Sequence, residues 1–195
     1  MTSAPTGDSP VQYIYRRNAL EKEQTLTLQD DGLLVEQEGK EARLIPWADV
    51  QEVQLQFAPT RVVRNLFTCT IKPVAGRKVF IHSMSFKGFA DFEERGAEYS
   101  AFLRALHRRL VAANDTVRCV SGSDPVMFWG MLGCNVVIFS VLALVMVVML
   151  FSIPPIAIVK LIILAIYAPL LIKWFKKNKP ATYEPGEPPA NMLPG

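Results

Sequence analysis

The residues from Val126 to Phe175 form an apolar stretch in which only Lys160 and Lys173 are charged. About fifty residues in one helix would extend ~75 Å, whereas the hydrocarbon core of a bilayer is ~30 Å thick. Backbone hydrogen bonds must be satisfied internally in lipid, so the stretch must be helical and must turn back. The sequence therefore predicts an integral membrane protein with a two-helix transmembrane hairpin.

Pro154 and Pro155 mark the turn of this hairpin. Proline removes a backbone donor and moves the preceding residue out of helical geometry. We expect a first helix at 126–151, ~39 Å long, and a second at 156–175, ~30 Å long. The first helix exceeds the thickness of the bilayer core and should tilt, whereas the second should fit with little tilt.

Positive charge predicts the orientation of the hairpin. Basic residues precede the first helix and follow the second, whereas the turn carries none. The positive-inside rule then places both termini in the cytoplasm. Lys160 is expected to snorkel to the far interface; in a conduction path it would need a carboxylate partner, and neither predicted helix contains Asp or Glu. The candidate anchors at the membrane interfaces are Trp129, Trp174, Lys173, Lys176, Lys177 and Lys160.

The chain before the hairpin is long enough for one domain, which we expect at 11–122. Residues 1–10 are polar, lack the regions of a secretory signal peptide and should be disordered, so the domain should stay in the cytoplasm. Residues 176–195 are rich in proline and should form a disordered tail. Residues 1–125 carry equal numbers of acidic and basic side chains, a balance that predicts no nucleic-acid partner.

Between Val11 and Ser83, apolar residues largely alternate with polar ones, and turn residues separate the alternating runs. Asp30-Asp31-Gly32 is typical of a hairpin turn, and 73–77 contains a second turn signal. The pattern predicts about seven short antiparallel strands in a sheet, sandwich or small barrel.

The period of the pattern changes after a predicted loop at 83–91. The segment 92–113 carries an apolar stripe at helical spacing, with His107 and several charged residues on the other side. We expect this amphipathic helix to cap the sheet, giving an α+β fold, and 115–122 to form an extended joint to the membrane. The stripe consists of Tyr99, Phe102, Leu103, Leu106 and Leu110.

About seven strands followed by one helix is the element order of the pleckstrin-homology (PH) superfold. The segment 33–110, about half of the chain, resembles bacterial PH-like domains, through the stretches Leu44–Val50 before a strand and Lys78–His82 at the end of the sheet. The resemblance implies a PH-like barrel in a protein of the bacterial inner membrane. In many such proteins the hairpin precedes the domain, whereas here it follows. The clustered basic residues that phosphoinositide-binding PH domains carry on the first hairpin are replaced here by 24–31.

Residues that could perform catalysis are few. His82 and His107 are the only histidines; Ser83, Ser85 and Asp91 lie near His82 in sequence, but without a Gly-x-Ser-x-Gly turn. No nucleotide-binding or zinc motif occurs, and the three cysteines share no metal-ligand spacing. We therefore expect no enzyme, no cofactor and no metal site.

Two functions remain. The first is a non-catalytic, membrane-tethered PH-like interaction module at the cytoplasmic face, with the lipid bilayer and an unidentified protein as partners. Anionic lipid heads could meet the basic residues before the first helix. The second is a small accessory subunit that binds a larger membrane complex through its hairpin. The candidate contact residues of the module are Arg61, Arg64 and Asn65 in one loop and Lys87 in the next.

Overall fold

The structure is a computed structural model that describes residues 11–60, 62–89, 91–152, 165, 168–169 and 171–194. The chain divides into two compact units, residues 1–120 with 182–195, and residues 121–181. The first unit combines β-sheets with a helix, so the predicted α+β class is confirmed. The predicted disordered segment 1–10 lies outside the described residues.

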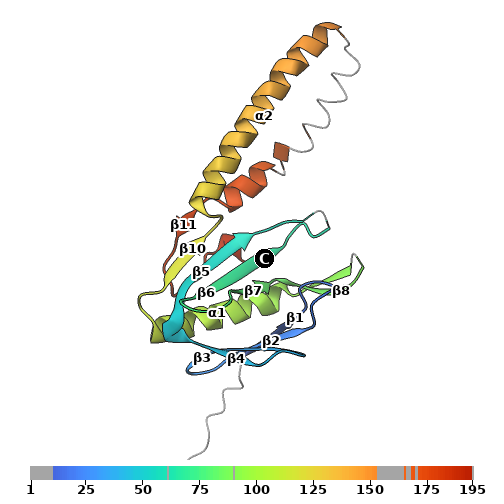
Figure 1. Cartoon of the computed structure of the whole chain (residues 1–195). Coiled ribbons are helices and arrows are strands. Elements are labelled where there is room, and N and C mark those ends of the chain that lie inside the picture. Colours follow the sequence, from blue (N-terminus) through green and yellow to red (C-terminus); the bar gives the residue numbers. More distant parts are fainter. Residues whose placement is uncertain are drawn as a thin grey trace, which may run out of the picture. The chain divides into compact units, whose positions relative to one another are not determined.

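The first sheet is an antiparallel meander in the order β1-β2-β3-β4 (Figure 1). The predicted turn at Asp30-Asp31-Gly32 is confirmed, because Leu28 of β2 pairs with Leu33 of β3. Gly32 is required by a close approach: a Cβ atom there would lie 2.3 Å from the carbonyl oxygen of Ile45. The four strands are β1 (Gln12–Tyr15), β2 (Gln24–Leu28), β3 (Gly32–Gln37) and β4 (Arg43–Pro46).

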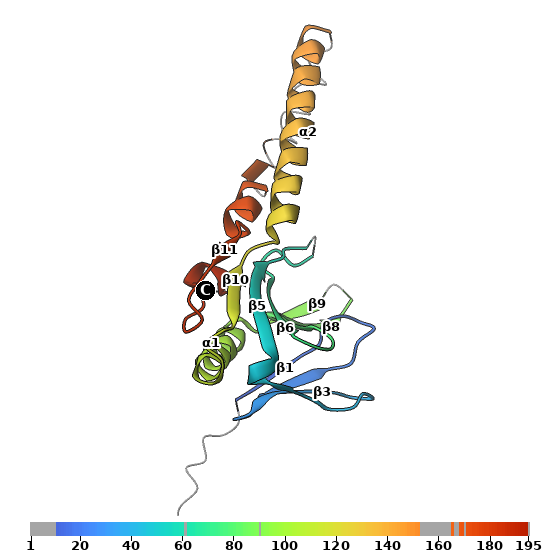
Figure 2. The ribbon, with the colours of Figure 1, turned by 60° about the vertical axis from the view of Figure 1, so that its left-hand side comes forward.

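The second sheet has the order β11-β10-β5-β6-β7. A 3-10 helix, η1 (Trp47–Asp49), leads into β5, and β5, β6 and β7 form an antiparallel meander. Strand β10 runs alongside β5 in the same direction (Figures 1 and 2). The strands are β5 (Val50–Phe57), β6 (Phe67–Pro73), β7 (Val79–His82), β10 (Arg118–Ser121) and β11 (Ala181–Thr182).

A third pair of strands replaces the loop expected at 83–91, so that prediction is wrong. Strands β8 (Met84–Gly88) and β9 (Asp91–Glu94) form an antiparallel hairpin. The rings of Phe86 and Phe92 lie opposite each other with centroids 5.5 Å apart, a cross-strand aromatic pair that stabilises such hairpins. The described residues therefore contain eleven strands, more than the seven or so expected.

The amphipathic helix is present as α1 (Gly96–Ala113), which begins four residues later than expected because β9 occupies the first part of the predicted segment. All five residues of the predicted apolar stripe are at most 1% exposed. The ring of Phe102 lies 5.5 Å from that of Tyr13 on β1. Beyond the helix, the Asn114 side-chain amide donates to the carbonyl oxygens of Trp47 and Val50 at 3.0 Å. The helix therefore packs on the first sheet, and the residue after it bonds to the start of the second sheet.

The C-terminal segment differs from the disordered tail that the sequence predicts. Its residues form β11 and a second 3-10 helix, η2 (Ala190–Met192), and Met192 and Leu193 are only 2% and 7% exposed. Its prolines restrict the unfolded chain and so reduce the entropy lost on ordering, while two apolar side chains supply burial. The prediction of disorder is therefore corrected for the described residues after Lys179.

The second unit contains α2 (Pro125–Ser152), which includes the whole of the predicted helix 126–151. Among the described residues, one helical stretch, Pro125–Val148, is long and apolar enough to cross a membrane, with a mean hydropathy of 2.6. Asp124 caps the helix, because its carboxylate accepts from the backbone N–H groups of Val126 and Met127 at 3.0 and 3.3 Å. Pro125 occupies the first turn, where its missing N–H costs nothing.

The chain returns beside the start of α2. Residues 171–177 are helical, and the Ser123 N–H donates to the Asn178 carbonyl oxygen at 3.0 Å. The Phe128 ring packs on Trp174 and Phe175, with centroids 6.5 and 5.6 Å away. The predicted turn at Pro154 and Pro155, most of the predicted second helix and Lys160 lie outside the described residues.

Candidate functional site

The predicted contact residues that the structure describes do not line the cavity that opens on the first unit. Arg64 and Asn65 are exposed in the β5–β6 loop, and Arg61 lies outside the described residues. Lys87 is exposed on β8, not in a loop, and its Nζ lies 3.2 Å from the Glu93 carboxylate. Because β5 and β10 run in the same direction, the β5–β6 loop lies at the same end of the sheet as the last residue of β10.

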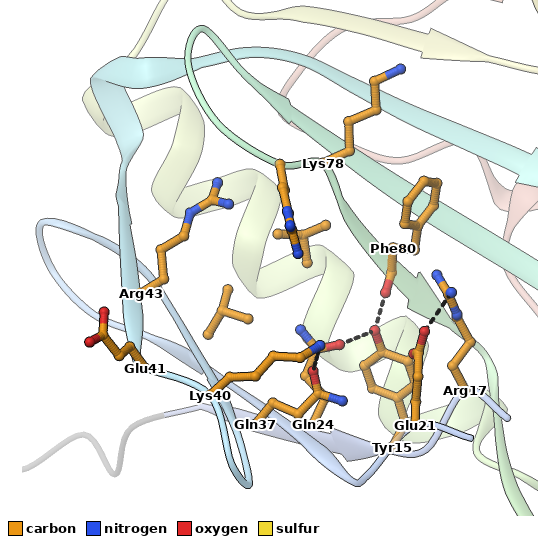
Figure 3. A pocket seen from close by; sticks show the side chains of 13 residues that line it. Tyr15, Arg17, Glu21, Gln24, Gln37, Lys40, Glu41, Arg43, Lys78 and Phe80 are labelled. Carbon is orange, nitrogen blue, oxygen red and sulfur yellow. Dashed lines mark hydrogen bonds and ion pairs between the residues drawn. The ribbon is translucent and has the colours of Figure 1, made fainter. Parts of the chain in front are cut away.

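A cavity of about 560 Å³ opens between three hairpin regions of the first unit (Figure 3). The β1–β2 connection contributes Arg17 and Glu21, the β3–β4 hairpin contributes Lys40 and Arg43, and the β6–β7 turn contributes further basic residues. The remaining lining residues are Tyr15, Gln24, Val35, Gln37, Glu41, Arg77, Lys78, Val79 and Phe80. We call this the basic pocket.

The basic pocket carries an excess of three positive charges, from five basic and two acidic lining residues. Arg17 is neutralised, since its guanidinium lies 2.6 Å from the Glu21 carboxylate. Within the described part of the chain, the side chains of Arg43, Arg77 and Lys78 make no hydrogen bond or ion pair. The pocket can therefore attract an anionic group without breaking an existing ion pair at these three residues.

Arg43 bridges two of the hairpin regions. Its guanidinium lies beside Gly76 of the β6–β7 turn, where a Cβ atom would sit 3.5 Å from it. Gly76 has a φ of +92°, a conformation that glycine adopts without strain. Arg77 and Lys78, which follow this glycine, line the same pocket as a guanidinium that comes from the other sheet. Figure 3 shows Arg43 and Lys78 on its wall. Such a fork can hold a carboxylate or phosphate by two parallel hydrogen bonds.

Tyr15 forms the base of the basic pocket. Its hydroxyl contacts the Phe80 carbonyl oxygen and the Gln24 side-chain oxygen, the latter at 2.9 Å. Burial raises the pKa of the Tyr15 phenol well above its ordinary value, so the hydroxyl keeps its proton. The Arg17 guanidinium lies over the Phe80 ring, 5.6 Å from its centroid. The pocket therefore has an aromatic wall beside its basic side chains.

The two serines near His82 form hydrogen bonds with backbone N–H groups. The Ser83 hydroxyl accepts from the Phe67 N–H at 3.0 Å, and the Ser85 hydroxyl accepts from the Arg16 N–H at 2.9 Å. The His82 ring stacks on Tyr15 at 6.0 Å. Burial, helped by the Arg17 charge, lowers the pKa of His82 to about 4, so the ring is neutral near pH 7. In the part of the chain that the structure describes, no cluster of His, Cys, Asp and Glu could hold a metal ion.

His107 is not on the polar side of its helix, as the sequence predicts, but fully buried. Its Nδ1–H donates to the Leu103 carbonyl oxygen at 2.7 Å, and its Nε2 lies 2.8 Å from the Tyr183 hydroxyl oxygen. The C-terminal segment covers this face of α1, which a helical pattern alone cannot reveal.

Sequence reasoning also missed Arg43, Arg77 and Lys78 as site residues. Their one signal is that Arg77 and Lys78 lie at the end of the predicted turn 73–77. No protein-family model matches this chain, and neither the search of curated proteins nor the search of solved structures found a match.

Proposed function

We propose that this chain is a non-catalytic, membrane-tethered PH-like interaction module whose basic pocket holds an acidic segment of a protein partner at the cytoplasmic face of a bacterial inner membrane. The observation that carries the proposal is the pocket itself, with Arg43, Arg77 and Lys78 lacking ionic partners in the described part of the chain. A volume of about 560 Å³ suits a few side chains of a bound segment.

The topology of the second sheet favours a protein partner over a lipid headgroup. Strand β6 runs antiparallel to β5, so the β6–β7 turn and the β5–β6 loop lie at opposite ends of the strands. Strand β10 ends at the same end of the sheet as the β5–β6 loop. Only Gly122, Ser123 and Asp124 separate β10 from α2. The turn that carries Arg77 and Lys78 therefore lies at the end of the sheet opposite to the one at which the chain leaves the first unit.

The order of the elements supports the PH-like proposal. A four-stranded meander is followed by the β5–β6–β7 meander and then by α1, which packs on β1 and η1. This is the order of seven strands and a C-terminal helix from which the resemblance was inferred. The β8–β9 hairpin and strands β10 and β11 are additions to that plan.

Two observations support the transmembrane hairpin and its orientation. Trp174 and Phe175 pack beside Phe128, so the chain that leaves along α2 comes back to its start. Tyr183 then bonds to His107 of the first unit, so residues before and after the apolar stretch belong to the same folded body. A chain that crosses a bilayer and returns to the same body must cross an even number of times.

Charge reversal in full-length protein in neutral phosphatidylcholine nanodiscs tests the pocket. We expect a labelled octaglutamate peptide to bind, more weakly as salt is raised, and Arg43→Glu/Arg77→Glu/Lys78→Glu to weaken binding at least ten-fold. The control, Arg64→Glu/Lys87→Glu, reverses two exposed charges outside the pocket and should change binding less than two-fold. A loss in the control with no loss in the pocket variant would move the site to the β5–β6 loop and β8. Pocket-dependent binding of phosphatidylglycerol vesicles without peptide binding would indicate a lipid ligand.

A groove on the second unit favours the alternative, an accessory subunit that binds through its hairpin. The groove has a volume of about 490 Å³ and is lined along α2 by Asn135, Ser140 and Ala143 and on the returning chain by Ala168 and Ile172. Small and polar side chains at such a surface let another transmembrane helix approach closely. Native electrophoresis in mild detergent distinguishes the two functions: a defined larger complex that survives deletion of residues 1–115 would favour the accessory subunit.

A further inference from the structure

The C-terminal segment, residues 181–194, lies on the first unit in the manner of a bound peptide. Its first residues extend the second sheet: β11 pairs with β10, and the Tyr183 N–H donates to the Cys119 carbonyl oxygen at 3.1 Å. Adding a strand to a sheet edge is a common way in which proteins bind extended peptides, because main-chain hydrogen bonds supply attraction for any sequence.

Side chains of the segment then supply specificity. The Tyr183 hydroxyl reaches the fully buried His107, 2.8 Å from its Nε2. At the other end, Met192 and Leu193 are buried on the first unit. Between these anchors, residues 184–187 form a turn in which Glu184, Gly186 and Glu187 are exposed, and the Glu187 N–H donates to the Glu184 carbonyl oxygen at 3.4 Å. The segment therefore binds at two separate points, as short recognition peptides do.

The surface beneath the last residues is shaped for a close approach. Gly96 begins α1, and a Cβ atom there would lie 3.1 Å from Cβ of Pro194. The Ser100 hydroxyl donates to the Pro194 carbonyl oxygen at 3.4 Å. Small side chains on this part of α1 thus let the segment approach closely, and the segment also contacts β5 through η2 and pairs with β10 through β11. We call the surface of α1, β5 and β10 that the segment covers the groove.

We infer that this groove is a peptide-binding site whose resident ligand is the chain's own C-terminal segment, and that an extended peptide of the same chemistry binds there in trans when the segment leaves. The chemistry is a tyrosine that follows a short strand and, after a proline-rich turn, a Met-Leu pair. This site is separate from the basic pocket, so peptide binding here does not depend on anion binding there. In the closed form, the resident segment excludes the partner.

A labelled synthetic peptide of residues 180–195 tests the inference. The protein is the full chain in nanodiscs and the same chain truncated after Lys179. We expect the truncated protein to bind the peptide at least ten-fold more tightly than the full chain does, since its groove is empty. A peptide with Met192→Asp should lose this binding, whereas a peptide with the exposed Glu187→Gln should retain it. Equal binding to both proteins, or none to a truncated protein whose near-ultraviolet circular dichroism matches the full chain, would overturn the inference.

A second variant covers the case in which truncation unfolds the first unit. Met192→Asp/Leu193→Asp in the full chain keeps the length of the chain and Tyr183. It removes the buried apolar contacts that hold the end of the resident segment on the first unit. We expect this variant to bind the added wild-type peptide, at least ten-fold more tightly than the unaltered chain. Absence of binding here would also overturn the inference.

Discussion

The Tyr183 hydroxyl oxygen lies 2.8 Å from Nε2 of His107, so two residues 76 positions apart join the chain after the apolar stretch to the helix before it. Because Nδ1 of His107 donates to the Leu103 carbonyl, Nε2 is the acceptor and the tyrosine is the donor. Burial lowers the pKa of His107 and raises that of Tyr183, so both groups are neutral near pH 7. This neutral pair holds the C-terminal segment in place.

Tyr183→Phe should destabilise the first unit. The substitution keeps the ring but removes the donor, which leaves the buried Nε2 of His107 without a hydrogen bond. We expect a loss of about 1–3 kcal/mol in the free energy of unfolding, measured by urea denaturation of the full chain in detergent. The C-terminal segment should also become more sensitive to protease.

A double substitution supplies the control. In His107→Leu/Tyr183→Phe both polar partners are gone, so no buried acceptor remains unsatisfied and part of the lost stability should return. Stability of Tyr183→Phe equal to that of the unaltered protein would show that the hydrogen bond contributes nothing.

Acid should destabilise the first unit between pH 6.5 and pH 4 through His82. Its pKa is about 4 in the folded protein against an ordinary value of 6.5, so the unfolded chain binds more protons throughout this window. The contribution of neutral His82 to the free energy of unfolding is therefore fully present above pH 6.5 and is lost as the pH is lowered toward 4. From pH 7 to pH 5 we expect a loss of about 2 kcal/mol from this residue, measured by urea denaturation at each pH.

The variant His82→Gln tests the assignment. Its stability at pH 7 can differ for other reasons, but its loss between pH 7 and pH 5 should be smaller by about 2 kcal/mol. The remaining loss should come from His107, whose pKa burial also lowers. An unchanged dependence on pH in His82→Gln would mean that the ring of His82 is accessible to protons and water in the folded protein.

The elements that the sequence predicted well are those whose cause is local. The stripe from Tyr99 to Leu110 follows from helical spacing alone, and all of it is buried. The turn at Gly32 and the apolar helix α2 likewise depend on neighbouring residues. The β8–β9 hairpin was missed because its stability depends on the pair Phe86 and Phe92, which can be recognised only once the two strands are paired.

The sites were missed because they are assembled from distant residues. Arg43 begins strand β4 and Arg77 lies in the β6–β7 turn, and nothing in the sequence shows that these two segments meet. The C-terminal segment binds through isolated anchors, Tyr183, Met192 and Leu193, and these do not form an apolar run. A segment rich in proline and poor in apolar residues is typical of disorder, yet here the burial of Met192 and Leu193 and the Tyr183 hydrogen bond hold it on the first unit.

Gly122→Ala should be more harmful than Gly39→Ala, although both glycines have positive φ, +85° and +81°. A Cβ atom at Gly122 would lie 2.5 Å from the Lys179 carbonyl oxygen, whereas none of the atoms around Gly39 comes within 4 Å. Gly39→Ala should cost about 1 kcal/mol for its backbone conformation. Gly122→Ala should cost at least about 2 kcal/mol more, because it also separates the returning chain from the start of α2. Equal melting temperatures of the two variants in detergent would contradict the close approach.

A reporter fused after Gly195 should be active in the cytoplasm. Basic residues lie on both sides of the apolar stretch, and Tyr183 bonds to His107 of the domain that precedes it. A stretch that crosses a membrane and returns to the same folded body would have both ends on one side, and the positive-inside rule predicts that this side is cytoplasmic. A fusion in which the segment after Lys179 is replaced by a flexible linker is the control, since it should report the same side without the help of the His107 contact. Activity of a periplasmic reporter at the same position, with a silent cytoplasmic one, would require an odd number of crossings and would rule out the two-helix hairpin.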